Sequence, residues 1–146
     1  MGVPMSEYDS DILVWSEHQA ELLRQHAAGA RLNDAAIDWP NIIEELVDVG
    51  RSELRSCRSL LRQALRHMLK AEAWPLSRDA PTWRADAIDF RRQARDAFSP
   101  SMRQKINVAD LYADALAAMP ETIDDQPPLP VPTECPVTLD ELLAAG

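Results

Sequence analysis

The stretch from Asp38 to Pro75 constrains the fold more than any other, because its apolar residues recur at helical spacing. This period predicts one long amphipathic helix. Asp38 is placed to cap its first turn, and Pro40 is tolerated there because a missing N–H leaves no intrahelical bond unmade. Trp74 precedes Pro75 and so disfavours further helix. The apolar positions are Ile42, Ile43, Leu46, Val49, Leu54, Cys57, Leu60, Leu61, Ala64, Leu65 and Met68.

Three further helices are predicted, and they span residues 9 or 11 to 28, 81–98 and 100–119. Residues 1–8 read as a loose lead-in. Gly29 suits the left-handed position that ends a helix, and Asn107 is placed to break the last of the three and cap its second part. The short connections between these helices favour antiparallel neighbours.

The C-terminal part changes character after residue 119. Five prolines fall between Gln126 and Pro136, which excludes helix and central strand and predicts an extended arm. Thr138-x-x-Glu141 is a capping box before a short helix whose leucines are expected to dock. The fold class predicted is therefore all-α: an antiparallel four-helix bundle with a Pro-rich C-terminal arm and a short terminal helix. Residues 1–119 form the bundle, and 120–146 form the arm and docking helix of the same domain.

Charge and cysteine usage restrict the setting of the protein. The chain has 24 acidic and 15 basic residues, and the excess acid disfavours nonspecific nucleic-acid binding. The acid lies mostly at the two ends, since residues 41–100 carry 11 basic and 9 acidic groups. No apolar run is long enough to span a membrane. The two cysteines form no C-x-x-C motif, so a reducing, cytoplasmic location is expected.

Two ionisable residues fall on the apolar side of the predicted helix. Glu53 lies near the azimuth of the apolar stripe, and His67 lies close to the same line but about 21 Å further along the axis. Each must therefore find a partner on another helix. One interpretation is a buried polar network that sets the register of the helices, and the other is acid–base or ligand chemistry. The candidate polar core consists of Glu45, Glu53, His67, Arg84 and Arg91.

Two charged groups on the same helix each allow two interpretations. Glu44, Glu45 and Asp48 suit the positive N-terminal end of a helix, or would supply carboxylates to a metal. Because no Glu-x-x-His pair exists, no metal site and no cofactor are predicted. The second group is either a solvated face or a ridge that contacts anions or RNA. This arginine ridge consists of Arg51, Arg55, Arg58, Arg62 and Arg66.

Motifs in four parts of the chain follow the pattern of one known family. They are Tyr8-x-x-Asp11-x-x-x-Trp15-x-x-x-Gln19; Asn41-x-x-Glu44-Glu45 with Val49-Gly50-Arg51-Ser52-Glu53 and Leu65-x-His67-x-Leu69-Lys70; Trp83-Arg84 with Phe90-Arg91-Arg92; and Ser99-Pro100-Ser101 with Glu134-Cys135-Pro136. On these residues the chain resembles the bacterial family known as domain of unknown function 29. The resemblance implies an all-α bundle of bacterial origin and no established activity.

The sequence favours a small cytoplasmic helical module that acts through a protein partner or by self-association, because no catalytic motif is present. One alternative is a metal-binding or hydrolytic bundle that uses Glu53, His67 and nearby carboxylates. The other is anion or RNA binding through the arginine ridge.

Overall fold

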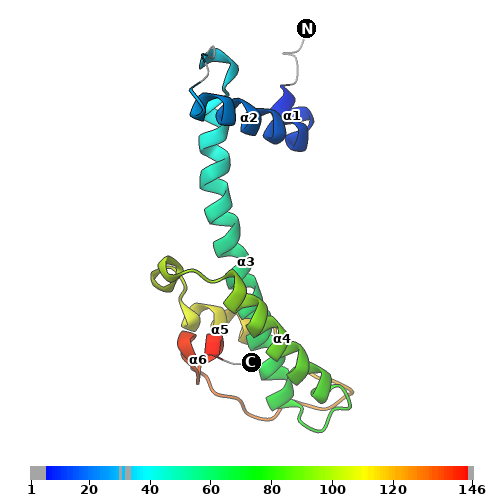
Figure 1. The fold of residues 1–146 in the computed structure, drawn as a ribbon. Helices are drawn as coiled ribbons and strands as arrows, with labels where there is room; N and C mark the ends of the chain where they lie inside the picture. Colours follow the sequence, from blue (N-terminus) through cyan, green and yellow to red (C-terminus); the bar gives the residue numbers. More distant parts are fainter. Residues whose placement is uncertain (1–5, 30, 32–33, 145–146) are drawn as a thin grey trace. The chain divides into compact units, whose positions relative to one another are not determined.

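The computed structural model describes residues 6–29, 31 and 34–144, and its secondary structure is helical throughout (Figure 1). The described residues contain six α-helices and no strand, which confirms the all-α prediction. The helices are α1 (Glu7–Ser10), α2 (Ile12–Ala27), α3 (Trp39–Ala73), α4 (Ala80–Ala97), α5 (Val108–Ala117) and α6 (Leu139–Ala144). None of the described helices is long and apolar enough to cross a membrane.

The chain divides into two compact units, Met1–Gly50 and Arg51–Gly146. Helix α3 contributes residues to both of them. The single domain predicted from the sequence, with a bundle over 1–119 and an arm over 120–146, stays a prediction.

In the first unit, the predicted N-terminal helix is α2, which begins after Asp11, one of the two predicted starts, and the short helix α1 precedes it. Asp11 adopts an extended conformation between α1 and α2, and its carboxylate accepts a hydrogen bond from Val14 N. The lead-in predicted for residues 1–8 is wrong at its end, because Ser6 caps α1 from residue 7 onward. Residues 1–5 lie outside the described part. Gly29 has a φ of +85°, which confirms its predicted place just after the helix.

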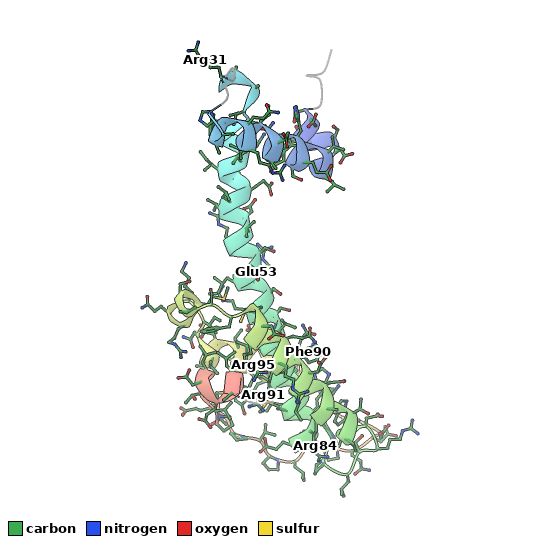
Figure 2. The ribbon with its side chains drawn as sticks, in the orientation of Figure 1. Arg31, Glu53, Arg84, Phe90, Arg91 and Arg95 are labelled. Atoms are coloured by element: carbon green, nitrogen blue, oxygen red, sulfur yellow. The ribbon has the colours of Figure 1, made fainter. Side chains whose placement is uncertain are left out.

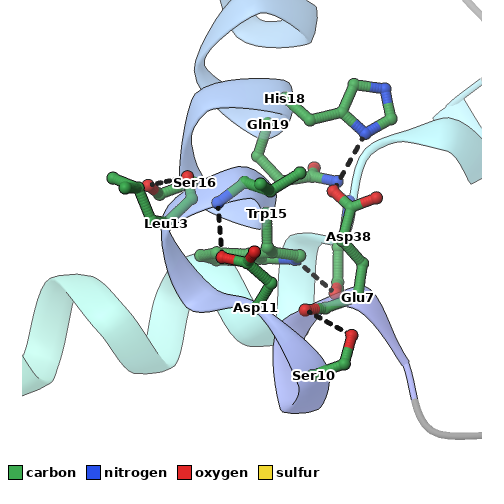
Figure 3. A network of polar contacts seen from close by, with 10 residues as sticks. Glu7, Ser10, Asp11, Leu13, Trp15, Ser16, His18, Gln19 and Asp38 are labelled. Atoms are coloured by element: carbon green, nitrogen blue, oxygen red, sulfur yellow. Dashed lines mark hydrogen bonds and ion pairs between the residues drawn. The ribbon is translucent and has the colours of Figure 1, made fainter.

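The inner side of α2 carries an aromatic ring and an amide. Trp15 and Gln19 are buried, and both reach Asp38 at the start of α3 (Figure 3). The Trp15 indole N–H donates to Asp38 Oδ2 at 3.2 Å, and Gln19 Oε1 accepts from the Asp38 backbone N–H at 2.8 Å. Asp38 also bonds Asn41, so it caps α3 as predicted, and these contacts together fix the entry into α3.

The second unit has its core on the C-terminal half of α3. Cys57, Leu61, Leu65 and Leu69 are buried there among side chains of the later elements. In the contacts between α3 and α4, higher residue numbers in α3 pair with lower residue numbers in α4. Cys57 Sγ lies 3.5 Å from Ala94 O, the His67 and Phe90 ring centres are 5.2 Å apart, and Lys70 Nζ lies 4.7 Å from the Trp83 ring centre.

The region predicted as one helix from Pro100 onward is divided. Pro100–Gln104 is a short 3₁₀ helix, and Ser99 makes no side-chain capping bond to it. Asn107 Oδ1 then accepts from Asp110 N at 3.2 Å and starts α5, as the predicted break required.

The proline-rich segment is an extended arm that ends in the docking helix predicted for it. Leu129 N donates to Ala73 O at the end of α3, and the Tyr112 hydroxyl donates to Pro132 O. Thr138 and Glu141 form the predicted capping box, with Glu141 N donating to Thr138 Oγ1 at 3.2 Å and Thr138 N donating to Glu141 Oε1 at 3.3 Å. Helix α6 then buries Leu142 and Leu143 in the core.

Candidate functional site

Glu53 is the residue for which the sequence prediction was wrong. Its side chain is exposed (Figure 2), and no polar contact involves it among the described residues. Helical spacing predicted the direction of its side chain but not which turns of α3 are covered, whereas Cys57, one turn further along, contacts Ala94 of α4. The carboxylate therefore needs no buried cationic partner, and Arg84 and Arg91 do not serve as one.

His67 is half-buried and is held by its own helix. Its Nδ1 lies 2.8 Å from the backbone oxygen of Gln63, which can only accept, so Nδ1 carries the proton of that bond. Nε2 then points to Asp86 of α4 at 3.9 Å. Together with the Phe90 ring contact, this arrangement packs the His67 side chain of α3 against α4.

Among the remaining members of the candidate polar core, Arg91 and Glu45 have separate partners. Arg91 of α4 donates to the carbonyls of Leu142 at 3.0 Å and Glu141 at 2.8 Å, and burial lowers the pKa of its guanidinium. Arg84 is exposed. Glu45 accepts a 2.6 Å hydrogen bond from the Tyr8 hydroxyl. The five residues predicted as one core therefore do not form one network.

All members of the arginine ridge are exposed, as expected for a solvated helix face. Arg58 donates to the backbone oxygen of Lys105. Four of the arginines border a shallow cleft of about 390 Å³, together with Leu54 and Ser59: Arg51, Arg55, Arg58 and Arg62. The cleft is therefore lined mainly by cationic side chains.

Metal binding and a reactive thiol each require particular side chains in the described part of the chain. No group of three His, Cys, Asp or Glu side chains is arranged there to hold an ion. The Cys57 thiol is buried and donates to Ala94 O, and burial raises its pKa, which disfavours the reactive thiolate.

The first unit has an apolar surface where the sequence predicted buried side chains. We call it the α3 apolar face; it consists of Ile43, Leu46, Val47 and Val49, all exposed. The exposed fractions of Leu46, Val49 and Ile43 are 69%, 60% and 57%. Sequence periodicity predicted Ile43, Leu46 and Val49 to be buried, because periodicity does not show whether another element covers a stripe; Val47 was not part of the predicted stripe.

A pocket of about 490 Å³ lies in the second unit, where α3 ends and the arm returns. Trp74, Ile123, Pro127 and Leu129 supply much of its lining, while Arg78 and Asp124 add opposite charges. Leu76 borders the same pocket with 97% of its surface exposed. The sequence contained no signal for this pocket, since it arises from the path of the arm.

Comparison with known proteins gives a family and a fold but no activity. The model of the family described as "Domain of unknown function DUF29" matches residues 7–146. The chain is similar to the crystal structure of an alpha-helical protein of unknown function from Rhodospirillum rubrum, with 30% sequence identity and a TM-score of 0.65. The match covers 97% of this chain and 91% of that one. No curated protein matches the chain.

Proposed function

The chain belongs to the DUF29 family, and we propose that this member is a small helical protein-interaction module. The observation that carries the proposal is the α3 apolar face. Single exposed apolar residues are ordinary on protein surfaces, but a contiguous group on one helix is typical of a surface that binds a partner.

The placement of α1 and α2 supports this function. Their polar contacts with α3 and its cap go to Glu45, through Tyr8, and to Asp38, through Trp15 and Gln19. At about 100° per residue, Glu45 and Asp38 lie about 140–160° around the helix from Ile43, although they lie within about 40° of Val49. The hydrogen bonds from α1 and α2 thus lie on the side of α3 opposite Ile43 and Val47, and both of these residues are exposed. Covering apolar surface contributes about 25 cal/mol per Å², which is the driving force for a partner.

The charge of the first unit indicates the chemistry of that partner. Residues 1–50 contain 10 Asp and Glu against 2 Lys and Arg. Glu44, exposed beside the α3 apolar face, contributes to this acidity. Pairing of this face with itself would bring two acidic units together and is disfavoured. The partner that fits is a basic amphipathic helix, with apolar residues on one side and Lys or Arg on the other.

The proposal includes a setting and an arrangement. We place the protein in the bacterial cytoplasm. The similar structure comes from a bacterium, which supports a bacterial origin. The free Cys57 and Cys135 are consistent with a reducing compartment. The contacts from Cys57–Ala94 to Lys70–Trp83 support an antiparallel packing of α3 and α4, as in the bundle predicted from the sequence.

Fluorescence anisotropy on the full chain tests the partner. The probes are two labelled synthetic helices with leucines at the same positions, one with lysine and one with glutamate at all others. We expect the lysine peptide to bind and the glutamate peptide not to bind. Leu46→Lys should weaken binding of the lysine peptide about tenfold or more, because it places a cation in the centre of the face. Leu76→Lys is the matched control in the second unit, and it should leave binding unchanged.

Three results would contradict the proposal. They are no binding of the lysine peptide, equal binding of the two peptides, and equal effects of Leu46→Lys and Leu76→Lys. Circular dichroism on each variant checks that the helix content is retained, so that a loss of binding reports on the face and not on unfolding.

A further inference from the structure

Leu76 combines an exposed apolar side chain with an adjacent apolar pocket. We infer that the end of α3 is the contact surface of a symmetric dimer, in which Leu76 of each copy enters the pocket of the other. A two-fold contact of this kind needs a surface that carries both the projecting group and the cavity that receives it. The end of α3 carries both within one patch.

Hydrogen bonds of the backbone and of the Trp74 indole fix the segments that line the pocket. Leu129 N donates to Ala73 O at 2.9 Å, and Trp74 Nε1 donates to Gln126 O at 2.9 Å. Ile123 and Gln126 exchange two backbone hydrogen bonds around a tight turn. Because these bonds already position the arm, binding does not have to order it, which lowers the cost of association.

The charges at the pocket favour a second copy as the occupant. Arg78 and Asp124 both line it, and neither has an ion-pair partner among the described residues. In the proposed dimer Arg78 of one copy pairs with Asp124 of the other, and two-fold symmetry then forms this pair twice. Residues 51–146 carry 14 acidic and 13 basic groups, so two copies of this unit approach without the repulsion that opposes self-pairing of the first unit.

Sedimentation equilibrium on the full chain tests the dimer. We expect a reversible monomer–dimer equilibrium with a dissociation constant on the order of 1–100 μM, as for a small interface. Leu76→Lys should raise this constant about tenfold or more, because the residue is exposed in the monomer and buried in the dimer. Leu46→Lys, on the α3 apolar face, is the matched control and should leave the constant unchanged.

A charge exchange tests the pairing of the two copies. Arg78→Glu and Asp124→Lys each place like charges together at both contacts of the dimer, so each variant alone should be more monomeric than the natural chain. An equimolar mixture of the two variants restores both oppositely charged pairs across the contact and should form mixed dimers. Circular dichroism checks the fold of Asp124→Lys, and if that variant does not fold, the comparison of Leu76→Lys with Leu46→Lys decides.

The proposal is overturned if the natural chain stays monomeric up to about 500 μM, well above the expected constant. It is also overturned if Leu76→Lys dimerises as tightly as the natural chain, or if Leu46→Lys weakens the dimer equally. If the mixture of folded charge variants stays monomeric, the proposed pairing of Arg78 with Asp124 across the two-fold axis is wrong. Peptide binding to the α3 apolar face is measured separately, so failure of the dimer leaves the proposed function standing.

Discussion

The hydroxyl of Tyr8 donates a 2.6 Å hydrogen bond to the carboxylate of Glu45, 37 positions later in the chain. This bond joins α1 to α3 within the first unit. The acceptor is one of the residues that the sequence assigned to a polar core, but its partner is a phenol and not an arginine. The bond also changes the acidity of the phenol, because an ionised Tyr8 could no longer donate it.

The first prediction concerns the titration of Tyr8. The hydrogen bond to Glu45, with burial and the neighbouring negative charges, raises its pKa from 10.0 to about 12. Absorbance titration should show a component near 12 that Tyr8→Phe removes and Glu45→Gln moves toward 10.0. Because the folded-state pKa is the higher one, the stabilisation is full below 10.0 and is lost as pH rises through about 12. If the component near 12 persists in Tyr8→Phe, it belongs to Tyr112.

The second prediction concerns Glu53. Because its carboxylate is exposed and has no polar contact among the described residues, Glu53→Ala should change the free energy of unfolding by less than about 0.5 kcal/mol. Leu61→Ala is the comparison on the same helix, and it should cost about 2–5 kcal/mol because Leu61 is fully buried. Urea denaturation measures both. A loss above about 2 kcal/mol for Glu53→Ala would restore the buried ion pair that the sequence suggested.

The third prediction concerns the link between α4 and α6. Arg91→Ala removes two hydrogen bonds to carbonyls in the last turns of α6. Because the guanidinium is only partly buried, we expect a loss of about 1 kcal/mol, below the usual range for bonds to charged groups. Arg92→Ala is the matched control, since Arg92 is exposed and makes no polar contact in the described chain. Amide exchange should accelerate at Leu142 and Leu143 in Arg91→Ala alone, and equal acceleration in both variants would contradict the prediction.

Local signals in the sequence predicted the helices and their ends well. The helix over 38–75 is α3, Trp39–Ala73, because a long period and a terminal proline are sufficient to define it. Asn107 and the pair Thr138–Glu141 cap helices as predicted, since a capping side chain reaches only three residues along the chain. Asp11 was one of the two predicted starts of α2, but the helix α1 before it was missed because a segment of four residues shows no helical period.

The candidate site was less predictable, because it depends on which residues other elements cover and not on the helical periodicity of the sequence. Glu53 and Leu46 both lie on the stripe that is buried from Cys57 onward, and both are exposed. Which turns of α3 are covered depends on where the other elements pack, and the spacing of residues in α3 contains no such information. The pocket beside Leu76 likewise forms only where the arm returns and turns at Asp124. The sequence did not predict this turn, because it contains no glycine.

The last prediction concerns that turn. Asp124 and Asp125 have φ values of 52° and 61°, so both lie in the left-handed region, as in the type I′ turn that closes a tight hairpin. Asp tolerates this region better than most residues, glycine adopts it freely, and a β-branched residue is strained in it. Asp125→Gly should therefore stabilise the protein by about 0.5 kcal/mol, because relief of the turn exceeds the added entropy of the unfolded chain. Asp125→Val should destabilise it by about 1–2 kcal/mol, and thermal unfolding of the two variants measures the difference. Equal stabilities for the two variants would show that residue 125 does not hold a left-handed conformation in solution.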